Sequence, residues 1–117
     1  MKTRYNIFAD VYDKDRICIG TGTNSYKKSH PLQAYFAKKV GRPEQIYLHA
    51  EIQAILRARE QKIESIRVYR FDSFGNKRNA KPCPICMEAI KAFGIKKITY
   101  TTDNGYKTIW ADDGNND

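Results

Sequence analysis

Two short motifs in this sequence have the residue types and spacing needed to hold a metal ion. One is H-A-E at positions 49–51, and the other is P-C-P-I-C at positions 82–86. One imidazole and two thiolates supply three ligands to a tetrahedral zinc ion and leave the fourth position for water, which is typical of a catalytic zinc and not of a closed structural one. The sequence therefore predicts a catalytic zinc ion bound by His49, Cys83 and Cys86.

Glu51 follows the predicted histidine ligand by two positions, which places its carboxylate beside the water on the metal. A zinc ion of this kind lowers the pKa of its water to near neutrality. A carboxylate next to that water can take up a proton and return it to a reacting group. We therefore expect Glu51 to act as the catalytic acid and base, and Ala50 to contact the substrate.

Each motif has a simpler interpretation when it is taken alone. A histidine on a helix is more often an ordinary surface or core residue, and a single C-x-x-C is also typical of redox pairs and structural zinc knuckles. A structural zinc would need a fourth ligand from His30 or Cys18, and we expect Cys18, in an apolar strand, to be a buried free thiol. A redox pair would not explain the H-A-E motif. The two motifs together favour the catalytic zinc.

Hydrophobic patterning predicts the elements that position these motifs. Strands are expected near residues 5–12 and 16–22 as a hairpin, then near 66–71, 97–102 and 107–110; helices are expected at 31–40, from about 48 to 62, and at 84–93. Both motifs then fall at helix N-termini, where the helix dipole and free N–H groups stabilise anions and lower thiol pKa values. The order of elements predicts a sheet with helices packed on its faces and parallel pairing late in the chain.

Length and composition indicate one globular domain. The chain has 117 residues, of which 41% are hydrophobic, and we expect a single domain over 1–111 followed by a frayed acidic tail over 112–117. No apolar run is long enough to cross a membrane and the N-terminus lacks a secretory signal, so an intracellular protein is expected. The formal charge of +8 favours anionic partners such as nucleotides or nucleic acid, although a merely solvated basic surface fits it equally well.

The H-A-E and P-C-P-I-C motifs resemble those of the cytidine deaminase superfamily, in which H-x-E and P-C-x-x-C mark zinc deaminases. The resemblance runs from about Ile17 to Thr102, because the family also places a strand and a Gly-to-Asn loop, here residues 20–24, ahead of the first motif. It implies an α/β fold, a three-layer α/β/α sandwich with a mixed sheet of about five strands, here without the N-terminal helix of most relatives. It also implies hydrolysis of an exocyclic amine to a carbonyl with release of ammonia.

Relatives act on several bases, and this chain looks like small deoxycytidylate deaminase-like proteins of the kind phages carry. The expected reaction is therefore conversion of cytosine to uracil in a nucleotide or nucleoside, with deoxycytidylate preferred. The resemblance implies that Asn24 bonds a sugar hydroxyl. Lys27, Lys28 and His30, in the loop that follows, are candidates to contact a phosphate.

Two other functions stay open at this point. The first is a deaminase of single-stranded DNA or RNA that stacks bases on Tyr26, Tyr106 or Trp110. The second is a non-catalytic zinc-binding nucleic-acid module, against which Glu51 argues, since such a module needs no proton carrier. The resemblance further implies a homo-oligomer, and we expect no membrane association and a location in the cytoplasm of a bacterial or phage-infected cell.

Overall fold

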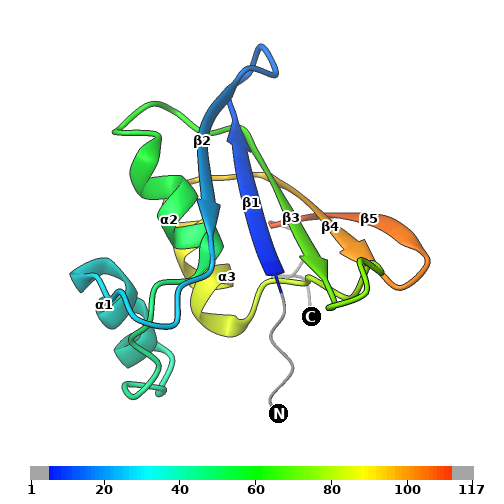
Figure 1. Cartoon of the computed structure of the whole chain (residues 1–117). Coiled ribbons are helices and arrows are strands. Elements are labelled where there is room, and N and C mark those ends of the chain that lie inside the picture. The colour runs from blue at the N-terminus through cyan, green and yellow to red at the C-terminus, as the bar shows by residue number, and fades with distance from the viewer. Residues whose placement is uncertain (1–5, 112–117) are drawn as a thin grey trace.

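Five strands and three helices make up residues 6–111, the part of the chain that the computed structural model describes (Figure 1). The elements in chain order are β1 (Asn6–Tyr12), β2 (Cys18–Thr23), α1 (Pro31–Lys39), α2 (Ala50–Arg57), β3 (Ser65–Phe71), α3 (Pro84–Ala92), β4 (Lys97–Thr102) and β5 (Gly105–Trp110). The acidic tail expected over 112–117 and the strand start expected at residue 5 lie outside the described residues. No helix within 6–111 is both long and apolar enough to cross a membrane.

The strands form one mixed sheet in the order β2-β1-β3-β4-β5. β1 and β2 pair as the expected antiparallel hairpin, and β1 also pairs antiparallel with β3. β3 and β4 are parallel, because the intervening chain returns through α3, while β4 and β5 form a second antiparallel pair. The predicted α/β class and five-stranded mixed sheet are confirmed.

The three helices lie on one face of this sheet (Figure 1). α2 packs on β1 and β2, and α3 packs beside α1 and α2. Alternate strand side chains point toward the helices and are buried, among them Val11, Ile66, Val68 and Ile98. Within residues 6–111 no helix covers the opposite face, so the second helical layer of the expected sandwich is not seen in the described range.

α2 is shorter than the sequence pattern predicts. The periodicity extends to about residue 62, but the helix ends at Arg57 with Ala58 as its C-cap. Arg59 and Glu60 follow with φ values of 50° and 68°, in the left-handed region that ends a right-handed helix. The prediction of a helix over 48–62 was therefore wrong at its C-terminal end. Hydrophobic spacing does not reveal where polar residues change the backbone conformation.

Candidate metal centre and catalytic cavity

Three side chains from two helix N-termini meet as the sequence predicts. His49 is the N-cap of α2, Cys83 is the N-cap of α3, and Cys86 lies in the first turn of α3. Neither N-cap side chain caps its own helix, because both turn toward the shared centre instead. The three potential ligand atoms lie within 4.8 Å of one another.

The spacing of these atoms fits one zinc ion. His49 Nδ1 lies 3.2 Å from Cys86 Sγ and 3.5 Å from Cys83 Sγ. Zinc bond lengths of about 2.0 Å to nitrogen and 2.3 Å to sulfur, at tetrahedral angles, place those atoms about 3.5 Å apart. An imidazole and two thiolates are also the soft donor set that zinc prefers. Cys18, the third cysteine, is outside this group and is exposed on β2, which corrects the expectation that it is buried.

A buried glutamine that the sequence analysis missed fixes the backbone of the histidine ligand. Gln33 on α1 is fully buried, and its Oε1 accepts a hydrogen bond from the His49 N–H at 3.1 Å. Its Nε2 donates to the Gln45 carbonyl at 3.2 Å. A polar residue on the buried side of the helix over 31–39 was the only signal in the sequence. Gln33 therefore joins α1, the following loop and the N-terminus of α2.

The ionisable groups of the centre perturb one another strongly. A hydrogen bond from Cys86 is the largest factor that lowers the pKa of Cys83, to about 4, and the nearby His49 adds to it. Burial raises the pKa of Cys86 well above its usual value. Burial lowers the pKa of His49, but its hydrogen bond and charge interaction with Cys83 outweigh this and the net shift is upward. The ionisation of each of these groups therefore depends on the others. A bound cation would offset the added negative charge when Cys86 ionises as well as Cys83.

Glu51 lies in the first turn of α2 and is 6% exposed. Burial raises the pKa of its carboxyl, opposed by a backbone hydrogen bond and by the nearby His49. The side chain lines a cavity of about 350 Å³ together with His49 and Cys83. The remaining lining residues are Ile7, Asn24, Ser25, Tyr26, Tyr47, Ala50, Val68, Arg70, Asn79, Ala80 and Lys81. A proton-accepting group and the potential metal ligands therefore share one pocket large enough for a nucleobase and part of its sugar.

The expected substrate contacts divide into two groups. Asn24 and Ala50 line the cavity. Asn24 is held to β1, because its Oδ1 accepts from the Ile7 N–H at 3.1 Å and its own N–H donates to the Ile7 carbonyl at 3.1 Å.

The cations expected at the phosphate lie outside the cavity lining. Lys27 and Lys28 are exposed in the loop after Asn24, and His30 Nδ1 accepts a hydrogen bond from the Leu32 N–H at 3.0 Å as the N-cap of α1.

Arg70 and Lys81 are the two cationic side chains among the cavity-lining residues. Neither was expected from the sequence, although Arg70 is a charged residue in phase with the apolar Ile66 and Val68 on the buried side of the strand. Val68 and Arg70 lie two apart on β3 and both line the cavity, so the helix-facing side of the strand carries Arg70 to the rim. Its guanidinium Nη1 donates to the Asn79 carbonyl at 3.3 Å.

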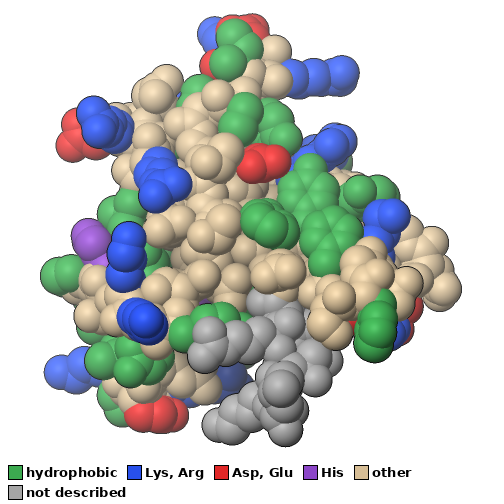
Figure 2. Space-filling view, in the orientation of Figure 1, with side chains coloured by type: hydrophobic (Ala, Val, Ile, Leu, Met, Phe, Trp, Pro, Cys, Tyr) green, Lys and Arg blue, Asp and Glu red, His purple; other side chains and the backbone are tan. Residues whose placement is uncertain are grey.

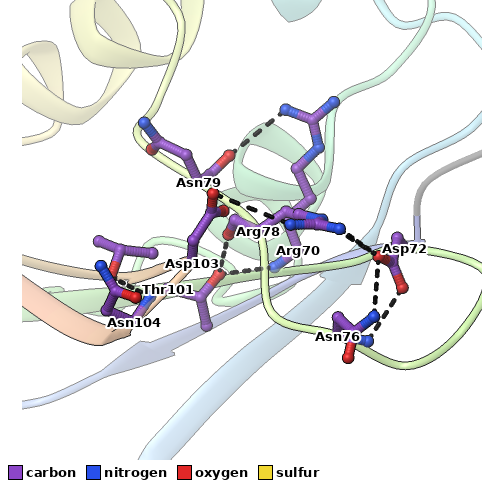
Figure 3. A network of polar contacts seen from close by, with 9 residues as sticks. Arg70, Asp72, Asn76, Arg78, Asn79, Thr101, Asp103 and Asn104 are labelled. Atoms are coloured by element: carbon purple, nitrogen blue, oxygen red, sulfur yellow. Dashed lines mark hydrogen bonds and ion pairs between the residues drawn. The ribbon is translucent and has the colours of Figure 1, made fainter.

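A polar network anchors the loop that leads to Cys83 (Figure 3). Thr101 Oγ1 accepts from the Arg70 N–H at 3.0 Å and donates to the Arg78 carbonyl at 2.7 Å. Arg78 in turn binds Asp72 through Nε at 3.1 Å and Nη2 at 2.9 Å. The Asp72 carboxylate also accepts backbone N–H bonds from Phe74 and Asn76, both at 2.9 Å. The chain between β3 and α3 is therefore tied to both strands just ahead of the cavity residues Asn79, Ala80 and Lys81.

Comparison with known proteins gives one family and one fold. The family model described as "Cytidine and deoxycytidylate deaminase zinc-binding region" matches residues 3–102. The crystal structure of cytidine deaminase from Mycobacterium leprae is similar at a TM-score of 0.51 and 20% sequence identity, over 90% of this chain and 75% of that chain. At this identity the likeness shows the fold alone. No curated protein sequence matches the chain.

Proposed function

The chain belongs to the cytidine and deoxycytidylate deaminase family, and from this premise we propose that it converts cytosine to uracil in a nucleotide, with deoxycytidylate as the preferred substrate. The observation that carries the proposal is the position of Glu51, a buried carboxylate that shares one cavity with two of the three potential zinc ligands. Zinc-dependent deamination follows from the family, while the base and its attachment are our inference.

The chemistry assigns a separate task to each group. His49, Cys83 and Cys86 would hold the zinc ion, which as a Lewis acid would make a water molecule acidic enough to react near neutral pH. Glu51 takes a proton from the attacking water and passes it to the ring nitrogen beside the amine-bearing carbon. As the carbon–nitrogen bond breaks, Glu51 delivers a second water proton to the departing amine. The products are ammonia and a ring carbonyl, so water is the only other reactant.

Substrate recognition follows from the polar groups of the cavity wall. The wall includes the apolar side chains of Ile7, Val68 and Ala80, which suit the faces of a base. Asn24 is proposed to bond a sugar hydroxyl, and Ala50 to contact the base.

Two cations at the rim support a phosphorylated substrate. Arg70 and Lys81 both line the cavity, and a guanidinium with an ammonium group is a suitable pair for a phosphate monoester. Lys27, Lys28 and His30 follow the cavity residue Tyr26 in the chain. Lys27 and Lys28 are proposed to add positive charge near the entrance, and not to replace Arg70 and Lys81. His30, whose Nδ1 accepts the Leu32 N–H, is proposed to offer a phosphate only its neutral Nε2–H.

A substrate panel tests this assignment. Zinc-loaded protein is incubated with cytidine, deoxycytidine, their monophosphates, guanine and adenosine, and released ammonia is measured. We expect deoxycytidylate to give the highest kcat/KM. Arg70→Gln and Lys81→Gln should raise KM for the monophosphate by about tenfold each and leave the nucleoside nearly unchanged. Equal losses with both substrates would contradict a phosphate role, and activity on guanine alone would contradict cytosine.

A second candidate, deamination of cytosine in single strands, has one observation in its favour. Tyr26 and Tyr47 line the cavity and are 48% and 52% exposed, so they could stack on flanking bases. Tyr106 and Trp110, the other aromatics considered for this role, are not among the cavity-lining residues. Activity on oligonucleotides that falls steeply with salt would favour this candidate over a mononucleotide deaminase.

Three further expectations stay predictions. Self-association into a homo-oligomer is checked by sedimentation of the zinc-loaded protein. Location in the cytoplasm of a bacterial or phage-infected cell is checked by fractionation. A non-catalytic zinc-binding nucleic-acid module would bind zinc and release no ammonia from any substrate of the panel.

A further inference from the structure

The sheet face opposite the helices carries a second set of side chains that the deaminase chemistry does not use. Cross-strand pairing places alternate residues of four strands on this face, because Phe8 pairs with Tyr69, Arg67 with Thr99, and Lys97 with Trp110. We call it the open face. Its members include Phe8, Asp10, Tyr12, Arg67, Tyr106 and Trp110.

Aromatic rings on the open face are accessible to solvent. Phe8, Tyr106 and Trp110 are 40%, 57% and 49% exposed. The rings form edge or tilted contacts, with centroids 6.3 Å apart for Phe8 and Phe71 and 6.2 Å for Tyr69 and Tyr106. Figure 2 shows hydrophobic side chains gathered over the middle of the sheet, with lysine and arginine side chains close by. Such rings offer flat apolar faces without a described element packed on them.

Cations lie among these rings. The Arg67 guanidinium is 6.0 Å from the centroid of the Tyr12 ring, and the Lys77 ammonium is 5.7 Å from that of Tyr106. At one end of the face a hollow of about 550 Å³ is lined by both rings and charges. Tyr12 and Trp110 line it beside Arg67 and Lys97.

The carboxylates of this region only partly offset its positive charge. Lys14, Arg16, Arg67 and Lys97 line the hollow against Asp13 and Glu64, and Asp10, opposite Arg67 on β1, adds a third carboxylate to the open face. With Lys77 beside Tyr106, the cations still outnumber these carboxylates. Asp13 Oδ1 accepts from the N–H groups of Asp15 at 2.8 Å and Ile17 at 3.0 Å, which holds this carboxylate in the turn between β1 and β2 with its charge retained. A second copy of the chain would bring like charges together here, so charge complementarity favours an anionic partner.

We propose that the open face binds a single-stranded polynucleotide, by stacking bases on its aromatic rings and pairing phosphates with Arg67, Lys97 and their neighbours. This activity goes beyond deamination, because the sheet itself separates the open face from the cavity that holds Glu51. Stacking and phosphate contacts make no use of the 2′-hydroxyl, so ribose and deoxyribose strands bind alike. A duplex, whose bases are already stacked, binds more weakly.

Trp110 gives a direct measurement, because it is the only tryptophan of the chain. Short oligothymidylate and oligouridylate are titrated into the zinc-loaded protein, and tryptophan fluorescence and sedimentation are followed. We expect both strands to quench the fluorescence, with an affinity that falls as salt is raised. Heparin, a polyanion without bases, should bind without comparable quenching. Absence of quenching by both oligonucleotides at low salt, or equal quenching by heparin, would overturn the proposal.

Variants separate the open face from the cavity. Arg67→Gln with Lys97→Gln should weaken oligonucleotide binding at least tenfold and leave kcat and KM for a mononucleotide unchanged. Lys38→Gln, an exposed cation on α1, is the matched control and should leave binding within twofold. Loss of binding in Arg70→Gln, or displacement of the strand by a mononucleotide, would assign the strand to the cavity and overturn the proposal. Because binding is measured without turnover, failure of the deaminase assignment would not affect this result.

Discussion

Gly22 lies directly against Ala50, so that a β-carbon on Gly22 would be 2.3 Å from the Ala50 carbonyl oxygen and 2.7 Å from the Ala54 nitrogen. A β-carbon on Gly20 would likewise be 2.4 Å from the Ala54 carbonyl oxygen. The first turns of α2 therefore rest on the backbone of β2 with no side chain between them. Since that part of α2 carries Glu51 and follows His49, the two glycines set the depth at which the catalytic groups lie.

Gly22→Ala should therefore displace α2. Contact with backbone atoms cannot be relieved by a rotamer change, and overpacking of this kind costs about 1–3 kcal/mol of the free energy of unfolding. We expect a lower urea midpoint and weaker zinc binding, measured by competition with a chelator. Gly41→Ala is the control: its β-carbon meets nothing within 4 Å, and only the strain of φ +80° opposes it. Unchanged zinc affinity in Gly22→Ala would contradict this role of the contact.

The sequence predicted the parts of the site whose identity depends on local spacing. His49, Cys83 and Cys86 were assigned from two motifs at helix N-termini, and they meet because α2 and α3 pack on the same face of the sheet. Arg70 and Gln33 could not be assigned in this way. Their positions depend on strand pairing and on the packing of α1, which bring them to the cavity rim and to the His49 N–H from other parts of the chain.

The same limit applies to the fold. The hairpin, the parallel crossover and the helix starts follow from turn residues and hydrophobic periods. The end of α2 depends on the left-handed backbone conformation of Arg59 and Glu60, and neither residue type predicts that conformation. Whether a helix covers each face of the sheet likewise depends on tertiary packing and not on periodicity.

Cys86→Ser should reduce bound zinc from about one ion per chain to a small fraction of that. A neutral hydroxyl is a poorer zinc ligand than a thiolate, and the two remaining donors do not hold a tetrahedral ion tightly. The measurement is metal analysis after dialysis without chelator. Cys18→Ser is the matched control, because Cys18 is exposed and outside the ligand group. Zinc loss in Cys18→Ser equal to that in Cys86→Ser would contradict the ligand assignment.

Gln33→Leu should weaken zinc binding without touching a ligand atom. It leaves the His49 N–H and the Gln45 carbonyl without their buried partner, at a cost of about 1–3 kcal/mol. We expect lower stability and a zinc dissociation constant raised severalfold. Full burial favours a neutral carboxyl in Gln33→Glu, which can accept from the His49 N–H and donate to the Gln45 carbonyl, so this variant should recover part of the affinity. An effect on stability alone would leave Gln33 with only a packing role and contradict the prediction.

Asp72 should make stability depend on pH in the acidic range. Burial acts to raise its pKa, but hydrogen bonds from the backbone of Asn76 and Phe74 and from the Asn76 and Arg78 side chains outweigh burial, so the pKa lies below its ordinary value. A lowered pKa in the folded state means that the ionised form stabilises the fold above about pH 4, and that this contribution disappears as the pH falls further.

Asp72→Asn tests that sign. The variant should be less stable than the wild type at pH 7 and should lose less stability between pH 7 and pH 3, as measured by urea midpoints. Asp103→Asn is the control, since that carboxylate is 61% exposed and 3.8 Å from Arg78. The prediction fails if Asp72→Asn and the wild type lose equal stability over this range.

Glu51→Gln should abolish turnover and keep the metal. The amide fills the same space but cannot accept the proton of the attacking water, and loss of general acid–base catalysis lowers kcat by about 10²–10⁴. Because burial raises the pKa of Glu51, the ionised carboxylate opposes folding at neutral pH. The metal-free variant should therefore be at least as stable as the metal-free wild type, although it is far less active. Glu88→Gln on α3, where the carboxylate meets Lys39 at 3.5 Å, is the control and should keep full activity. A Glu51→Gln protein with full zinc and turnover within tenfold of the wild type would show that another group moves the protons.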